Sequence, residues 1–271
     1  MINMNEDKVW QKVQLARNVK RPTAQVLIKY LINDFIELHG DRLYGDDSCF
    51  IGGIGFFSGM PITVIGQEKG LSTKEKIIRN FGMGHPEGYH KALRLMKQAE
   101  KFNRPVLFII DTPGAYPGIG AEERGQAMAI AVNLSEMINL KVPMISVIIG
   151  EGGSGGALGI GVSDEVWMLE NAIYSILSPE GFASILYKDA SLAKQAAVDM
   201  KITAQDLYQF KIIEKIIPEV EGGLHLNPKY SFDILKKHLL EKYSQLRRQS
   251  IADLLNNRYN KYRNIGIYEE H

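Results

Sequence analysis

A strand-like run that ends in a glycine-rich turn is the strongest constraint in this sequence. Residues 142–149 are mostly apolar, and this pattern predicts a buried strand. Residues 150–161 then hold seven glycines, which leave the backbone amides without side-chain cover. Peptide N–H groups fixed at a strand-to-helix turn suit an anionic oxygen. The plainer interpretation is a turn that lets a strand and a helix pack closely.

The composition excludes several classes of protein. The 271 residues are 45% hydrophobic and carry a net charge of +1, which gives no reason to expect a nucleic-acid or membrane partner. No apolar stretch reaches the roughly 18 residues of a membrane span, and the start lacks the apolar region of a secretory signal. Cys49 is the only cysteine, which excludes internal disulfides and a thiolate-rich zinc site. We therefore expect a cytoplasmic protein without a metal site of its own.

The predicted elements follow the order strand, strand, helix, repeated with variation. Strands are expected at 50–57 and 61–66 (a hairpin), 106–110, 142–149, 166–170, 173–177 and 212–217. Helices are expected from Thr23 to about Leu38, over 86–102, from about 121 to 140, in stretches up to 210, and from Ser231 onward, with a polar loop at 67–84. This order predicts one α/β domain over 1–271, with a helical segment at 1–45, a ββα core at 46–225 and a helical segment at 226–271.

The glycine segment also fits two other motifs of ligand or substrate chemistry. Gly150, Gly152 and Gly155 match the dinucleotide fingerprint, with Glu170 at the usual distance, but the helix that follows would be short and interrupted by glycines. A phosphate-binding P-loop is excluded because no Gly-Lys-Ser/Thr follows any glycine run.

Residues 152–156 match the nucleophile elbow G-x-S-x-G of serine hydrolases, with Ser154 as nucleophile. An acid and a histidine in the required chain order are available at Asp189 or Asp199 and at His225 or His238. None of these four residues sits in a distinctive local pattern. A serine among glycines is also simply a small residue, so the hydrolase remains an alternative.

A second loop, Asp111–Gly118, follows the neighbouring strand, so it is expected at the same rim of the sheet. Its two prolines and two glycines fix an unusual loop shape, and Tyr116 offers a flat apolar face with a polar tip. This pattern suits one wall of a pocket for a flat heterocycle, or a rigid surface loop.

Charged groups near these loops have plainer interpretations. A basic cluster in the 67–84 loop suits phosphates or an acidic partner, or forms a solvated face; it comprises Lys69, Lys74, Lys76 and Arg79. Glu122 and Glu123 are placed to stabilise a helix start rather than to act in acid–base catalysis. His85 and His90 do not have metal-ligand spacing.

Short motifs along the chain match one family in order and spacing. They are Gly40-Asp41-Arg42, Asn80–Met83, Pro86–Tyr89, Lys91–Met96, Asp111–Gly118, Ala121–Gln126, Gly150–Leu158, Ser178–Gly181 and, less specifically, Asn227-Pro228. Over roughly residues 10–265 the chain resembles the α subunits of bacterial acetyl-CoA carboxylase carboxyltransferase. The resemblance implies a crotonase (ClpP/crotonase-like) fold, a spiral of ββα units with flanking N- and C-terminal helices.

The resemblance also implies an activity. In that family the α and β subunits together transfer a carboxyl group from carboxybiotin, presented by the biotin carboxyl carrier protein, to acetyl-CoA. The product is malonyl-CoA for fatty-acid biosynthesis. A subunit of another biotin-dependent acyl-CoA carboxyltransferase or decarboxylase is the related alternative.

The same resemblance implies the partners. The β subunit is expected in an α2β2 heterotetramer with the active site between the subunits, and biotin carboxylase in the larger complex. Zinc is expected only in the β subunit, and no cofactor is expected to be covalently bound to this chain.

By resemblance, the backbone N–H groups of Gly155 and Gly156 are the oxyanion donors. They would stabilise the charge on the ureido oxygen of biotin, and biotin's own nitrogen would take the proton from the acetyl methyl group, so no side-chain base is expected. The expected biotin pocket comprises Gly152, Gly153, Gly114, Tyr116 and Gly118. Phe182 and a shorter N-terminal segment depart from the family's usual pattern.

Overall fold

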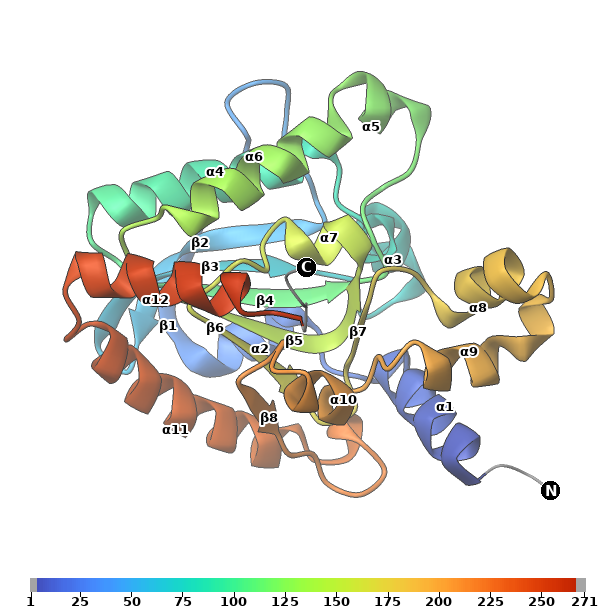
Figure 1. Ribbon diagram of the computed structural model, residues 1–271. Helices are drawn as coiled ribbons and strands as arrows, with labels where there is room; N and C mark the ends of the chain where they lie inside the picture. Colours follow the sequence, from blue (N-terminus) through green and yellow to red (C-terminus); the bar gives the residue numbers. More distant parts are fainter. Residues whose placement is uncertain (1–3, 267–271) are drawn as a thin grey trace, which may run out of the picture.

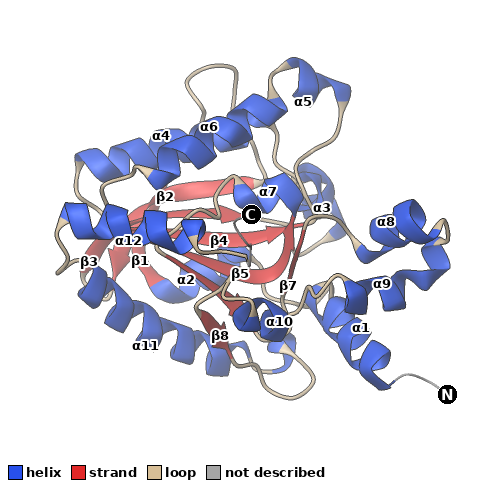
Figure 2. Cartoon of the chain, in the orientation of Figure 1, coloured by secondary structure: helices blue, strands red, loops and turns tan. Residues whose placement is uncertain are grey.

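One mixed β-sheet with helices on both faces organises the chain. The structure is a computed structural model, and it describes residues 4–266. In this range the strands are β1 (Ile32–Glu37), β2 (Phe50–Phe57), β3 (Met60–Gln67), β4 (Val106–Thr112), β5 (Met144–Gly153), β6 (Glu165–Leu169), β7 (Ile173–Ser175) and β8 (Lys215–Ile217). Figure 2 shows the strands together at the centre with the helices outside them.

The helices form three groups around the sheet. They are α1 (Met4–Ala16), α2 (Ala24–Leu31), α3 (Thr73–Ile78), α4 (Pro86–Lys101), α5 (Ile119–Glu123), α6 (Gln126–Ile138), α7 (Ser154–Leu158), α8 (Pro179–Phe182), α9 (Ala193–Asp199), α10 (Ala204–Gln209), α11 (Pro228–Leu246) and α12 (Ile251–Arg263). Helices α4 and α6 pack together, α11 lies on the opposite side of the sheet, and α1, α8 and α9 pack together at one end (Figure 1).

The sheet changes from antiparallel to parallel at β3. The strand order is β1-β2-β3-β4-β5-β6-β8, in which β1, β2 and β3 are antiparallel neighbours and the remaining pairs are parallel. The carboxyl ends of β4 and β5 therefore lie at the same edge, as expected for their two glycine-containing loops. The hairpin is confirmed, and Ser58 and Gly59 form its turn with positive φ angles of 49° and 82°.

Strand β5 divides between two partners. Its first part pairs with β6, and its last three residues pair with β7. Against β4 its register shifts, because Ile110 faces Ile148 whereas Thr112 faces Gly152. Asp111 of β4 therefore lies opposite the three residues 149–151 of β5, which form a bulge at the start of the glycine-rich segment.

The expected helix from Thr23 to Leu38 is wrong in its second half. It ends at Leu31, and Ile32–Glu37 instead form β1 within the segment expected to be helical at 1–45. Distant residues decide this, because β2 offers backbone partners and its glycines make room. A Cβ atom on Gly53 would overlap the carbonyl oxygen of Ile36.

Three further expectations need correction. The expected helix over 121–140 is interrupted at Gly125, which has a φ of 81° and separates α5 from α6. The expected polar loop at 67–84 contains α3, which begins with a capping box between Ser72 and Glu75. Strand β4 also continues two residues beyond the expected Ile110, so its end reaches the rim.

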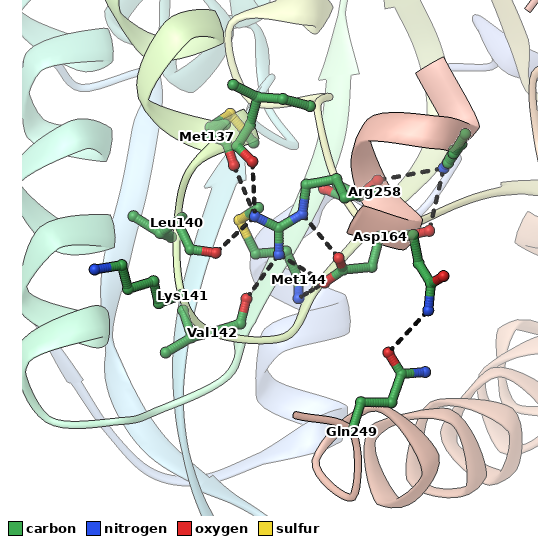
Figure 3. A network of polar contacts seen from close by, with 12 residues as sticks. Met137, Leu140, Lys141, Val142, Met144, Asp164, Gln249 and Arg258 are labelled. Atoms are coloured by element: carbon green, nitrogen blue, oxygen red, sulfur yellow. Dashed lines mark hydrogen bonds and ion pairs between the residues drawn. The ribbon is translucent and has the colours of Figure 1, made fainter. Parts of the chain in front are cut away.

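The C-terminal helix α12 is fixed by one buried arginine. Arg258 is 1% exposed and contacts Asp164 at 2.8 Å and the carbonyl oxygens of Met137, Leu140 and Val142 at 2.6–3.0 Å (Figure 3). Burial raises the pKa of Asp164, an effect that the Arg258 guanidinium and the Met144 amide oppose only in part. This network holds the segment that leads into β5.

Within residues 4–266, no helix is long and apolar enough to cross a membrane.

Candidate active site

The glycine-rich turn, residues 150–161, contains the end of β5 and the whole of α7, which follow each other directly. Gly153 precedes the first helical residue, Ser154, whose φ of 52° is uncommon for a residue other than glycine. Gly155 and Gly156 are the second and third helical residues, and amides in the first turn of a helix have no partner within it. The two sequence-predicted donors therefore lie where the backbone leaves N–H groups free.

The loop after β4 packs directly on this turn, and only glycine fits there. A Cβ atom on Gly156 would lie 2.5 Å from the amide nitrogen of Ala115, and one on Gly153 would overlap the carbonyl group of Pro113. Gly155 differs, because its Cβ would make an ordinary 3.6 Å contact with Ile130. Gly153 and Gly156 thus serve close packing, whereas Gly155 faces space that a side chain could enter.

Two buried side chains, Gln67 and Tyr89, hold the turn, and neither was predicted from the sequence. Gln67 Nε2 donates to the carbonyl oxygen of Gly156 at 2.7 Å, and Tyr89 Oη donates to the same oxygen at 3.3 Å. Both side chains are completely buried. The only available signal was a polar residue, Gln67, at the end of an apolar strand.

A mostly apolar cavity of about 530 Å³ lies in front of Ser154 and Gly155. Its wall includes Leu158 from α7 and Tyr174 and Ile176 from β7 and the loop that follows. Leu158 and Ile176 remain 42% and 75% exposed. The cavity therefore combines free backbone donors with apolar surface that is not covered within the described part of the chain.

The expected pocket residues are only partly brought together. Gly114 packs on Gly156, and a Cβ atom on Gly152 would lie 2.8 Å from the ring of Tyr174. Tyr116 instead stacks on His85, with ring centroids 4.1 Å apart, and a Cβ atom on Gly118 would overlap the Tyr116 ring. Among the residues described, none of Gly114, Tyr116, Gly118, Gly152 and Gly153 lines the cavity at Gly155, and neither does Gly156.

The residues considered for a serine-hydrolase triad do not meet at Ser154. Asp189 accepts a hydrogen bond from the Ser191 amide, and Asp199 accepts one from Tyr187. His225 lies in the turn Leu224–Leu226, and His238 lies 3.3 Å from Lys215. In the described range the Ser154 hydroxyl has no hydrogen-bond partner, so the structure supplies no base for a serine nucleophile.

The dinucleotide and metal alternatives also lack structural support. Helix α7 has only five residues, and Glu170 accepts a hydrogen bond from the Glu219 amide. Across residues 4–266, no group of three or more His, Cys, Asp or Glu residues is arranged to hold a metal ion.

The basic cluster is not a single solvated face. Lys69 is 17% exposed and pairs with Asp111 at 2.8 Å and Glu151 at 2.7 Å. Burial alone would lower the pKa of Lys69, but the two carboxylates outweigh this effect and raise the pKa. Arg79 donates to the carbonyl oxygen of Ser48, and Lys76 is half-buried, so Lys74 alone of the four basic residues is exposed.

Comparison with known proteins decides the family. The model of the family described as "Acetyl co-enzyme A carboxylase carboxyltransferase-like" matches residues 3–266. The chain belongs to this family. The resemblance stated from the motifs is therefore confirmed.

Relatives within the family are similar over nearly the whole chain. The "Acetyl-coenzyme A carboxylase carboxyl transferase subunit alpha" of Clostridium perfringens is 60% identical over 256 residues, which cover 94% of each chain. The protein of the same name from Staphylococcus haemolyticus is 56% identical, over 97% of this chain and 84% of its own length. A Clostridium tetani protein named "subunits beta/alpha" is 56% identical, over 98% of this chain and 46% of its own length.

Solved structures show the fold. Transcarboxylase 12S superposes with a TM-score of 0.68 at 17% identity, over 87% of this chain and 45% of that one. The β subunit of Pseudomonas aeruginosa geranyl-CoA carboxylase superposes with a TM-score of 0.63 at 14% identity, over 89% and 43%. The prediction of a crotonase-type α/β fold is confirmed.

Proposed function

We propose that this chain is the α half of a carboxyltransferase that transfers a carboxyl group from carboxybiotin to acetyl-CoA and so forms malonyl-CoA. The observation that carries the proposal is the pair of free amides in the first turn of α7, at Gly155, which lines the apolar cavity, and at Gly156, which follows it in the chain. Family membership supports the same chemistry, because the α-subunit relatives are named for it.

The cavity suits the bicyclic ring of biotin, which is compact, largely apolar and carries one planar, polar ureido group. When bound, biotin would supply a nitrogen that carries and releases the carboxyl group. The amides of Gly155 and Gly156 would donate hydrogen bonds to the oxygen on which negative charge develops. Fixed donors of this type stabilise a transition state because they need no reorganisation during the reaction. Of the expected pocket residues, Gly152, Gly153 and Gly114 pack within or against the turn, whereas Tyr116 and Gly118 lie on the adjacent loop and do not line the cavity.

A β partner completes the proposal. Two large apolar side chains, Ile119 on α5 and Met128 on α6, are 79% and 67% exposed. Exposed apolar side chains of this size are typical of a surface that another chain covers. The β/α protein of Clostridium tetani joins a region like this chain to a β region. We extend the proposal to an α2β2 assembly with zinc in β, served by the carrier protein and by biotin carboxylase.

Reconstitution tests this function. The chain alone should form no malonyl-CoA from carboxybiotin and acetyl-CoA, and the copurified complex with a β subunit should form it. Parallel assays with propionyl-CoA and glutaconyl-CoA separate the related carboxyltransferase and decarboxylase alternatives. Malonyl-CoA formation by the chain alone would contradict the divided site, and a complex inactive with every acyl-CoA would contradict the function.

A further inference from the structure

A charged network lies next to the glycine-rich turn and shares no residue with the lining of the cavity at Gly155. Lys69, at the end of β3, contacts both Asp111 of β4 and Glu151 of β5. Arg17, just after α1, contacts Glu151 at 2.7 Å and Glu180 of α8 at 2.7 Å. Arg17, Lys69, Asp111 and Glu151 line a separate cavity of about 210 Å³, and the reaction described above uses none of these groups.

The network coincides with the bulge in β5. In the bulge, β5 lacks regular backbone pairing with β4, and side chains take over. Asp111 Oδ1 accepts a 2.9 Å hydrogen bond from the Glu151 amide, and Arg21 Nε donates a 2.6 Å hydrogen bond to the carbonyl oxygen of Ile149. Gly150 makes the approach possible, because a Cβ atom there would overlap the Asp111 carboxylate.

Both ends of the Lys69–Glu151 pair stay charged at neutral pH. Burial opposes the charged form of each group, but the neighbouring charges outweigh burial. Asp111 and Glu151 raise the pKa of Lys69, and Lys69 and Arg17 lower the pKa of Glu151. Removal of the lysine would leave the Asp111 and Glu151 carboxylates close together with Arg17 as the remaining partner of Glu151. Like charges in a partly buried position repel each other, and this repulsion would act on the segments of β4 and β5 that carry them.

We infer that Lys69, Asp111, Glu151 and Arg17 are positioning residues for carboxyl transfer, because they hold the β5 bulge that directs the Gly155 and Gly156 amides. Gly152 pairs with Thr112 and Tyr174 directly after the bulge, and Ser154 begins the helix two residues later. A change in the bulge is therefore transmitted to the donors through the three bonded residues Gly152, Gly153 and Ser154. Bulges next to active sites commonly have this role of redirecting a strand.

The inference rests on the proposed function and is tested in the complex with a β subunit by Lys69→Met. The variant should lower kcat at least about tenfold while the KM for acetyl-CoA stays within about twofold, because displaced donors weaken the transition state more than substrate binding. Amide hydrogen exchange should accelerate over residues 149–158. Lys69→Arg keeps the charge and should recover most of the activity.

Lys261→Met is the matched control. Lys261 is 12% exposed and pairs with Glu214 at 2.8 Å, but it lies on α12, away from the turn. This control should lower the melting temperature and leave kcat and exchange over 149–158 unchanged. If Lys69→Met does not fold, Arg17→Met removes the more exposed cation of the network and should lower kcat in the same direction.

A Lys69→Met complex with wild-type kcat and exchange, or with a loss of activity that only follows the loss of folded protein, would overturn the inference. Failure of the proposed function has a different signature, since the wild-type complex would then form no malonyl-CoA. The exchange comparison between Lys69→Met and Lys261→Met would still decide whether the network holds the turn.

Discussion

The side-chain amide of Gln67 donates a 2.7 Å hydrogen bond to the carbonyl oxygen of Gly156. The bond joins the end of β3 to the first turn of α7, two segments that lie far apart in the sequence. Tyr89 of α4 reinforces it at the same oxygen. The residue that supplies the second proposed donor is thus fixed by buried groups that never face the cavity.

Gln67→Leu should lower both stability and kcat. The substitution leaves the Gly156 carbonyl oxygen with Tyr89 as its remaining side-chain donor, and loss of a buried hydrogen-bond partner costs about 1–3 kcal/mol. Gln67→Glu should be worse, because an ionised carboxylate would face the carbonyl oxygen. Thermal unfolding and steady-state kinetics of the complex measure the two effects. Wild-type stability in both variants would show that the contact does not anchor the turn.

The two donor glycines should respond differently to alanine. Gly156→Ala places its methyl group 2.5 Å from the Ala115 amide and should destabilise the chain by about 1–3 kcal/mol or more. Gly155→Ala makes an ordinary contact at 3.6 Å, so its stability should match or exceed wild type by up to about 1 kcal/mol. Urea unfolding of both variants distinguishes them, and equal losses would contradict the packing described.

Ser154→Gly should stabilise the chain without loss of transfer. The φ of 52° at Ser154 costs a residue with a Cβ atom about 1 kcal/mol or more, and glycine avoids this cost. Ser154→Ala should keep carboxyl transfer within a few-fold of wild type, since the hydroxyl has no partner within the described residues. Abolished activity in both variants would instead indicate chemistry by the hydroxyl group.

Arg258→Met should destabilise the chain in a pH-dependent way. It leaves Asp164 buried without its cation, which typically costs about 3–5 kcal/mol. Burial already raises the Asp164 pKa above its usual value, and loss of Arg258 should raise it further. A raised carboxyl pKa favours folding below that pKa, so the deficit relative to wild type should shrink as pH falls from about 8 to about 5. Urea unfolding of both proteins at these pH values provides the measurement. A deficit that grows toward low pH would contradict the assignment.

Local signals explain what could be predicted from sequence. The apolar run at 142–149 and the glycines after it carry their own conformational preferences, so a strand followed by a helix start among the glycines was predictable, although β5 continues to Gly153. The assignment of Gly155 and Gly156 as donors came from the family resemblance and stays a prediction. Strand β1 was not, because Ile32–Glu37 follow a helix and become a strand only through pairing with β2. Tyr116 has the chemistry of a pocket wall, but its stacking on His85 depends on a loop 30 residues away.

The charged network shows the same limit more clearly. Lys69 appears in the sequence as one of several basic residues in a polar loop. Its carboxylate partners, Asp111 and Glu151, end two other strands, and only the sheet order brings the three together. No local pattern in a single sequence reports such a pairing.

The most direct test of the proposed site is the kcat for malonyl-CoA formation by the Gly155→Val complex with a β subunit. A Cβ atom at Gly155 makes an ordinary contact with Ile130 at 3.6 Å, so we expect the valine side chain to be tolerated and to obstruct access to the Gly155 and Gly156 amides. Gly45→Val is the matched control, because a Cβ atom at Gly45 meets nothing within 4 Å. We predict a loss of about 100-fold or more for Gly155→Val, the effect of losing an oxyanion donor, and near-wild-type turnover for Gly45→Val. Near-wild-type turnover by Gly155→Val would contradict the assignment of these amides.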